Sequence, residues 1–447
     1  MTDTPKDTGA PIRHVVPWED PAFTDPAELD AELRRVFDIC HGCRRCFNLC
    51  DVFPRLFNLI DESESGELDS VDSQDFDLAI EACTLCDMCF MTKCPYVPPH
   101  EFDLDFPHLM LRARAAQSTS GKVRFMAHQI RKTDRNGKLG TKVPGLANWA
   151  LAESNSLTRP VIQAIAGIHR RAHLPPFAKQ TLVQQAKVEP SVVNASAFAH
   201  GRKAVLYATC AGNFNHTNIG LAARAVLAKN GIDVEVVYPG CCGMPQLETG
   251  DISSVAESAR TVAAELCDWA DQGYDVIALI PSCALMLKYE WPLLVPGNDN
   301  VKRLAAATWD VSEYVVGIAR NEGLAEGLQP LGGAVALHLA CHARAQNMGS
   351  KAAEMLGFIP EADITVIKRC SGHGGAWGIE KNNFEAALKV GKPAAREAKG
   401  ANAAWVASEC PLAGDHIIQG IDELAPGNSL PAVHPIELLA RAYGLDI

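Results

Sequence analysis

Eight cysteines lie in two short windows near the N-terminus, and their spacing constrains the fold more than any other feature. Each window has three cysteines at steps of three residues and a fourth after a slightly longer gap. The first window contains Cys40, Cys43, Cys46 and Cys50, and the second contains Cys83, Cys86, Cys89 and Cys94. This is the ligand spacing of a chain that carries two 4Fe–4S clusters. Disulfide bonds and zinc are the alternatives, and a repeated group of four thiols favours iron–sulfur.

The fourth cysteine of each window predicts how the thiols are shared between the clusters. Pro95 interrupts the chain after Cys94, so that this thiol can point away from the three that precede it. In proteins with two such clusters, the fourth cysteine of one window binds the other cluster. The predicted ligand sets are Cys40, Cys43, Cys46 and Cys94 for one cluster, and Cys83, Cys86, Cys89 and Cys50 for the other.

Composition narrows the classes of protein to which the chain can belong. Its 447 residues are enough for two or three domains, and 16 of them are cysteine. Residues 1–32 are polar and lack the apolar stretch of a secretory signal, and no apolar run is long enough to span a membrane. Clustered thiols without an export signal indicate a cytoplasmic protein. The formal charge of −12 argues against nucleic acid as a partner.

One stretch departs from this acidic average. Between His108 and Val188 the chain has fourteen lysines and arginines but only two acidic residues, Asp134 and Glu153. One interpretation is a linker that packs a helix and leaves its arginines in solvent. The alternatives are a surface that binds an acidic redox partner and a peripheral contact with the inner face of the membrane.

Hydrophobic patterning divides the chain into segments of different fold class. We expect an all-α, ferredoxin-like domain with two 4Fe–4S clusters because the apolar residues around the cysteine windows have helical spacing. From Arg202 onward, short runs rich in Val and Ile alternate with longer Ala-rich helical stretches, which predicts two α/β modules with parallel sheets. The predicted segments are a polar tail (1–32), a helical ferredoxin domain (33–110), a basic helical linker (111–201), module 1 (202–328) and module 2 (329–447).

The two modules are predicted to be copies of each other. Three short strands in each module end close to a cysteine, and the corresponding cysteines are separated by nearly the same length of chain. In parallel sheets, ligands bind at the edge formed by the carboxyl ends of the strands. We therefore expect the thiols to gather in one crevice per module. The cysteines are Cys210, Cys241, Cys242 and Cys283 in module 1, and Cys341, Cys370 and Cys410 in module 2.

These thiols suggest different chemistry in the two modules. Four in module 1 are enough to bind a third iron–sulfur cluster, whereas three in module 2 would leave one position open. His342 and His373 follow module 2 cysteines, and each is a candidate ligand, proton donor or turn residue. We interpret Cys267, in a predicted helix, as a small buried apolar residue.

Paired cysteine windows followed by two cysteine-rich modules resemble a known family. The chain is similar to the heterodisulfide reductase-like iron–sulfur oxidoreductases with cysteine-rich CCG domains, which include the iron–sulfur subunit of anaerobic glycerol-3-phosphate dehydrogenase. The resemblance covers about residues 35–110 and 202–420, and Cys241-Cys242-Gly243-Met244-Pro245 is its most specific part. It implies an electron-transfer or disulfide-reducing role beside a partner enzyme.

The chain departs from the family pattern in both modules. The closing CxxC becomes Cys283-x-x-Met286 in module 1 and Cys410-x-x-Ala413 in module 2, and Cys-Cys-Gly becomes Cys370-Ser371-Gly372. Heterodisulfide reductases use their full cysteine set to bind non-cubane clusters, so the resemblance does not extend to that chemistry in module 2.

Three functions follow from these observations. The first is an oxidoreductase subunit that passes electrons between two 4Fe–4S clusters and a cysteine-rich site, working with a dehydrogenase or reductase. No glycine-rich dinucleotide motif follows a strand, so we expect neither a flavin nor a nicotinamide site, and the partner would supply two-electron chemistry. The alternatives are a self-contained reductase of a disulfide or peroxide, acting at Cys341, Cys370 and Cys410, and a docking or membrane-recruitment subunit.

Overall fold

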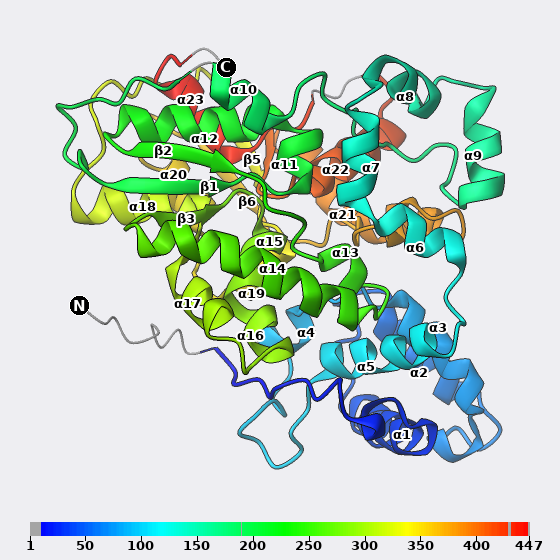
Figure 1. Cartoon of the computed structure of the whole chain (residues 1–447). Helices are drawn as coiled ribbons and strands as arrows, with labels where there is room; N and C mark the ends of the chain where they lie inside the picture. The colour runs from blue at the N-terminus through cyan, green and yellow to red at the C-terminus, as the bar shows by residue number, and fades with distance from the viewer. Residues whose placement is uncertain (1–9, 189, 428–430, 446–447) are drawn as a thin grey trace.

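The computed structural model of the chain describes residues 10–188, 190–427 and 431–445. A helical N-terminal region, a series of short helices and two α/β modules succeed one another along the chain (Figure 1). Among the described residues no helix is both long enough and apolar enough to cross a membrane.

The N-terminal region is helical around both cysteine windows, as its apolar spacing predicts. Asp25 caps the first long helix by accepting hydrogen bonds from the backbone N–H groups of Ala27 and Glu28. Phe37, Phe53 and Phe106 form an aromatic core, in which the Phe53 and Phe106 ring centres are 5.0 Å apart. The elements are η1 (Pro21–Thr24), α1 (Pro26–Cys43), α2 (Val52–Asp61), η2 (Leu68–Ser70), η3 (Ser73–Phe76), α3 (Asp77–Ala82), α4 (Met88–Thr92) and α5 (Phe106–Thr119).

The segment expected as a polar tail is packed from its first described residues. Val16 and Phe23 are buried, and the Trp18 indole N–H donates a hydrogen bond to the Leu294 carbonyl of module 1. Helix α5 continues through residue 110, where we placed the end of the helical domain, so the domain and the basic stretch share this helix.

The basic stretch forms short helices, and those up to residue 166 run up one side of the molecule (Figure 1). They are α6 (Phe125–Arg131), α7 (Thr133–Gly140), α8 (Pro144–Leu151), α9 (Thr158–Ala166) and α10 (Leu182–Val188). The interpretation that the arginines lie in solvent is wrong for several of them. Arg112 donates to the Phe23 and Ala22 carbonyls, and Arg131 and Arg159 are buried. These guanidinium groups bind backbone carbonyls or carboxylates and thereby join the parts of the chain.

Module 1 is a parallel four-stranded sheet with helices on its two faces. The strands are β1 (Lys203–Tyr207), β2 (Asp233–Val237), β3 (Asp275–Ala278) and β4 (Thr308–Asp310), in the order β2-β1-β3-β4. The β1 strand is almost wholly buried, as expected for the centre of a parallel sheet. The helices are α11 (Cys210–Phe214), α12 (Thr217–Lys229), α13 (Met244–Leu247), α14 (Ile252–Asp271), α15 (Pro281–Leu285), the π-helical turn η4 (Met286–Glu290), α16 (Trp291–Leu294), α17 (Asp299–Ala307) and α18 (Val311–Asn321).

Module 2 repeats this arrangement with a smaller sheet. Its strands are β5 (Val335–His338), β6 (Ile364–Ile367) and β7 (Trp405–Ser408), in the order β6-β5-β7, all parallel. An isolated parallel bridge between Ala407 and Val433 lies where module 1 has β4. The helices are α19 (Cys341–Ala345), α20 (Lys351–Leu356), η5 (Trp377–Ile379), α21 (Phe384–Gly400), α22 (Pro411–Leu424) and α23 (Pro435–Ala442). All six strands expected from the sequence are present, so the prediction of two α/β modules with parallel sheets is confirmed.

Candidate functional site: converging cysteines

The first group of thiols is formed by the two cysteine windows together. Cys40 and Cys43 lie in the last turn of α1, which ends where Arg44 takes up a left-handed conformation. Burial raises the pKa of Cys40, and the neighbouring thiols Cys94, Cys46 and Cys43 raise it further. Cys94 from the second window is therefore a close neighbour of the first three cysteines, as the predicted sharing requires.

The second group also combines both windows. Cys83 ends α3, Cys89 lies in α4, and Cys86 lies between them, flanked by Leu85 and Asp87 with positive φ of 48° and 62°. These left-handed residues wind the backbone around the Cys86 thiol. Burial raises the pKa of Cys50, and Cys86 and Cys83 raise it further. Thiols of the second window are thus the leading cysteine neighbours of Cys50.

The second group touches module 2 directly. The Cys86 thiol shares a hydrogen bond with Cys341, which lowers the pKa of Cys86, and Cys341 also bonds Cys370. The hydrogen bond with Cys341 lowers the pKa of Cys370 to about 7. Cys86 of the N-terminal region, Cys341 after β5 and Cys370 after β6 thus form one continuous group of thiols. The sequence did not predict this contact.

Module 1 gathers its four thiols at the carboxyl edge of its sheet. The Cys210 and Cys241 sulfurs are 3.9 Å apart, and Cys242 shares hydrogen bonds with Cys241 and Cys283. The hydrogen bond with Cys210 is the main cause that lowers the pKa of Cys241, and the Gly243 N–H donates a further bond to its sulfur at 3.5 Å. These contacts stabilise a thiolate at Cys241, as a metal ligand requires.

A single cavity of about 300 Å³ lies between the modules, where we expected one crevice in each. Seven of the cysteines line it: Cys86, Cys210, Cys242, Cys283, Cys341, Cys370 and Cys410. Cys410 precedes the first turn of α22, and Cys283 of module 1 contributes to the raised pKa of Cys410, after the larger effect of burial. The two sheet edges therefore face each other, and the cavity receives thiols from both modules and from the N-terminal region.

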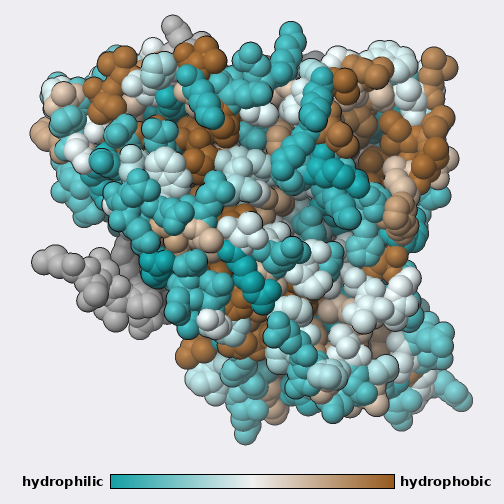
Figure 2. All heavy atoms as spheres, in the orientation of Figure 1, coloured by the Kyte–Doolittle hydropathy of each residue, from teal (hydrophilic) through white to brown (hydrophobic). Residues whose placement is uncertain are grey.

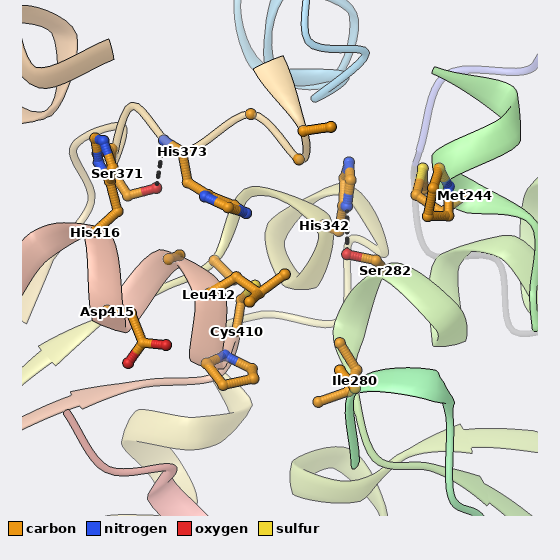
Figure 3. A pocket seen from close by; sticks show the side chains of 18 of the residues that line it. Met244, Ile280, Ser282, His342, Ser371, His373, Cys410, Leu412, Asp415 and His416 are labelled. Carbon is orange, nitrogen blue, oxygen red and sulfur yellow. Dashed lines mark hydrogen bonds between the residues drawn. The ribbon is translucent and has the colours of Figure 1, made fainter. Parts of the chain in front are cut away.

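The two candidate histidines have different surroundings in this cavity (Figure 3). The His342 ring bonds the Ser282 hydroxyl at 2.8 Å and the Leu85 carbonyl at 3.2 Å, so both of its nitrogens are engaged. His373 is half-buried, its ring lies 6.2 Å from that of His416, and its buried Nε2 has no partner among the described residues. Burial lowers the pKa of His373 to about 3. His373 is thus a neutral imidazole with a nitrogen available to a ligand, and His342 connects module 2 to its neighbours.

Glycines allow the loop after β6 to approach the other parts of the site. Gly374 has a φ of 53°, and a Cβ placed there would lie 2.5 Å from the Thr84 methyl group. A Cβ on Gly375 would lie 2.0 Å from Glu248 of module 1. The sequence Gly372-His373-Gly374-Gly375 therefore lets the backbone that carries His373 pack against the Cys83–Cys86 loop.

Two carboxyl groups with a raised pKa also lie at this site. Burial raises the pKa of Glu248, which lines the cavity, to about 7, and that of Glu409 to about 8. The Glu409 side chain accepts a hydrogen bond from the Ala340 N–H, one residue before Cys341. Sequence analysis missed both residues and His416, because their proximity to the thiols arises from tertiary packing. Glu409 had a local signal, since it directly precedes Cys410.

The donor set fits iron–sulfur clusters better than single metal ions. Among the described residues, no three Cys, His, Asp or Glu side chains converge as ligands of one ion. A cluster takes each thiolate at a different iron, so its ligands surround a volume instead of meeting at a point. Besides burial, the neighbouring thiols Cys94, Cys46 and Cys43 raise the pKa of Cys40, and Cys86, Cys83 and Cys50 raise that of Cys89, so the thiols of each group lie around one another in this way. Cys267 lies apart in α14, where its thiol contacts the Asn300 carbonyl.

Comparison with known proteins agrees with the duplicated cysteine-bearing sheets. The family model of the cysteine-rich domain CCG matches residues 204–288 and again residues 335–413. The chain contains two CCG cysteine-rich domains. They coincide with the sheet and thiol loops of modules 1 and 2, so the family resemblance predicted from the sequence is confirmed.

Curated relatives extend the similarity beyond the CCG domains. The chain is 26% identical over 356 residues to a subunit of the anaerobic glycerol-3-phosphate dehydrogenase of Escherichia coli strain K12, which covers 76% of this chain and 82% of that protein. It is 27% identical over 190 residues to lactate utilization protein A of Geobacillus thermodenitrificans, covering 40% and 75%. It is 25% identical over 252 residues to a subunit of the fumarate reductase (CoM/CoB) of Methanothermobacter marburgensis, covering 55% and 47%.

Proposed function

We propose that this chain is the electron-transfer subunit of an iron–sulfur dehydrogenase or reductase. The observation that carries the proposal is the contact between Cys86 and Cys341, because it joins the N-terminal thiol groups to the cavity between the modules. Two relatives are named as subunits of enzymes, one of a glycerol-3-phosphate dehydrogenase and one of a fumarate reductase, which supports a role beside a partner enzyme.

The proposed roles of the thiols follow from their neighbours. Cys40, Cys43, Cys46 and Cys94 would hold one 4Fe–4S cluster, and Cys83, Cys86, Cys89 and Cys50 the other. Cys210, Cys241, Cys242 and Cys283 would hold a third iron–sulfur cluster in module 1. Such clusters carry single electrons when bound. The chain supplies burial and thiolates: Cys241 and Cys370 have lowered pKa values because neighbouring thiols donate to them.

Contact between the groups defines the proposed order of electron transfer. Cys89 of the second group has Cys46 of the first group among its electrostatic neighbours, and Cys86 reaches Cys341. Electrons from a partner would therefore enter at the first group and reach module 2 before module 1.

A second function, a self-contained reductase, is favoured by the cavity itself. Its volume of about 300 Å³ is at the lower end of small-ligand sites. Cys370, with a pKa near 7, and the neutral His373 both line it, and they are suited to attack a disulfide or peroxide and to accept a hydrogen bond. Turnover of such a substrate by the purified chain, with a chemical reductant such as dithionite as the electron source and no partner protein, would favour this function over that of a subunit.

Iron content tests the proposed function. We expect the anaerobically purified chain to hold at least about eight irons, from two 4Fe–4S clusters, together with the signal of a third cluster. Cys241→Ala or Cys242→Ala should abolish the third signal in electron paramagnetic resonance and leave the other eight irons. Cys267→Ala is the matched control, since its thiol lies outside every group.

Two results would contradict parts of this proposal. Iron that remains at about eight in the native chain and in both variants would mean that module 1 holds no cluster. Purification from the native host without any co-purifying dehydrogenase or reductase, together with turnover by the chain alone, would contradict the role of a subunit.

A further inference from the structure

Helix α7 of the basic stretch packs against the thiol site of module 1. Figure 2 shows hydrophilic side chains over this helix, and Arg135 and Lys138 are exposed on its outer side. Its inner side contacts α11, the helix that begins at Cys210. Gly137 lies at this contact, where a Cβ would fall 2.2 Å from the Phe214 ring. The glycine therefore lets α7 approach the module 1 site closely.

Two hydrogen bonds hold the first turn of α7 on module 1. The Tyr238 hydroxyl, directly after β2, donates to the Asp134 carboxylate at 2.8 Å. The Gln246 side chain, in α13, donates to the Arg131 carbonyl at 3.1 Å. Thr133, the first residue of α7, lies between these two attached residues. Its position relative to the thiol loop of module 1 is therefore fixed from both sides.

The Thr133 hydroxyl contacts two of the module 1 thiols directly. Its oxygen is 3.5 Å from the Cys241 sulfur, and it also shares a hydrogen bond with the Cys210 thiol. Hydrogen bonds with Cys210 and, to a smaller extent, with Thr133 lower the pKa of Cys241. A hydroxyl that favours the thiolate form donates its proton toward the sulfur, because a thiolate can only accept a hydrogen bond. Thr133 is therefore a hydrogen-bond donor to these sulfurs whenever they are ionised.

Other hydroxyl groups near the site are engaged elsewhere. The Tyr207 hydroxyl donates to the Gly240 carbonyl at 2.7 Å, and the Tyr238 hydroxyl is bonded to Asp134. The Gly243 N–H donates to the Cys241 sulfur, but no side-chain substitution removes this backbone group. Among the residues that the structure describes, Thr133 thus supplies the one hydroxyl that bonds a module 1 thiol.

We propose that Thr133 is a positioning residue that raises the reduction potential of an iron–sulfur cluster held by the four module 1 thiols. Reduction adds a negative charge to a cluster, and the positive end of the O–H dipole stabilises that charge at the sulfurs. Hydrogen bonds to the sulfurs are among the factors that set cluster potentials. The inference rests on the proposed function in one respect, namely that module 1 holds a cluster. It gives α7 a role in electron transfer that its basic composition does not indicate.

Potentiometric titration of the third electron paramagnetic resonance signal tests the proposal in the anaerobically purified, full-length protein. Thr133→Val removes the hydroxyl and should make the equilibrium constant for reduction about tenfold smaller, which is a midpoint potential about 59 mV lower for one electron. Thr133→Ser keeps the hydroxyl and should retain the native midpoint. Thr141→Val is the matched control, because the Thr141 hydroxyl lies in the first turn after α7 and donates to the Gly137 carbonyl at 2.8 Å.

A second variant without the hydroxyl separates its effect from that of packing. Thr133→Ala should lower the midpoint in the same direction as Thr133→Val, with the native iron content and circular dichroism. A native midpoint in either variant would overturn the proposal. Loss of the third signal in both would also overturn it, because the hydroxyl would then be needed for assembly of the cluster. Absence of the third signal from the native protein would instead contradict the cluster proposed for module 1, and this inference with it.

Discussion

Replacing Arg13 by Gln should lower the free energy of unfolding by about 3–5 kcal/mol, because it leaves buried carboxylates without their cation. The Arg13 guanidinium contacts Asp87 at 2.7 Å, Asp105 at 2.9 Å and Glu290 at 2.9 Å. The arginine comes from the first described residues, Asp87 and Asp105 from the helical region, and Glu290 from module 1. The cation therefore joins three parts of the chain at one buried point.

The pKa shifts in this cluster indicate which carboxylates depend on the arginine. Burial tends to raise the pKa of Glu290, but His108 and Arg13 outweigh it and lower the value to about 2. Burial raises the pKa of Asp87 in spite of the nearby Arg13. Without the guanidinium, Asp87 would be the carboxyl group with the largest uncompensated cost of burial. It directly follows Cys86, which makes the contact with module 2.

Urea unfolding followed by circular dichroism measures this effect under anaerobic conditions. The matched control is Arg35→Gln, whose partner Glu32 is a surface residue, and this change should leave the urea midpoint nearly unaltered. Glu290→Gln combined with Arg13→Gln should recover part of the lost stability, since one buried charge is then removed. If the Arg13→Gln variant has the same urea midpoint as the native protein, the buried ion pairs make no net contribution to the free energy of unfolding.

The strands and the thiols at their ends were predictable because both signals are local. Val and Ile runs such as 234–237 and 364–367 are long enough only for short strands, and each is followed within a few residues by a cysteine. Parallel pairing then requires these cysteines to lie at one edge of each sheet. The predicted gathering of Cys210, Cys241 and Cys283 therefore needed no knowledge of the packing between domains.

Contacts between domains were not predictable, since no local pattern encodes them. Cys86 and Cys341 are brought together by the packing of the helical region on module 2. Arg13 lies 74 residues from Asp87 and 277 residues from Glu290, and the segment around it is as polar as a solvated tail. The basic stretch was misinterpreted for a related reason: Arg159 resembles a surface residue until the four backbone carbonyls around it are seen.

The sharing of thiols between the two N-terminal groups leads to the prediction with the largest effect on iron content. If Cys94 completes the first set and Cys50 the second, the variant Cys43→Ala/Cys94→Ala removes two ligands of one cluster and should retain about half of the eight irons. The variant Cys43→Ala/Cys50→Ala removes one ligand from each cluster and should lose nearly all of them. Each variant lacks two thiols, so each is the matched control for the other.

The structure supports this order of effects. Besides burial, the thiols Cys94, Cys46 and Cys43 raise the pKa of Cys40. Among the thiols that raise the pKa of Cys50, Cys86 has the largest effect. Iron analysis and electron paramagnetic resonance of the two anaerobic variants measure the result. If each window instead binds its own cluster, the outcome reverses: Cys43→Ala/Cys50→Ala keeps half of the iron, and Cys43→Ala/Cys94→Ala loses it. Because the fourth thiols alone decide between these results, the comparison tests the ligand assignment independently of any partner enzyme.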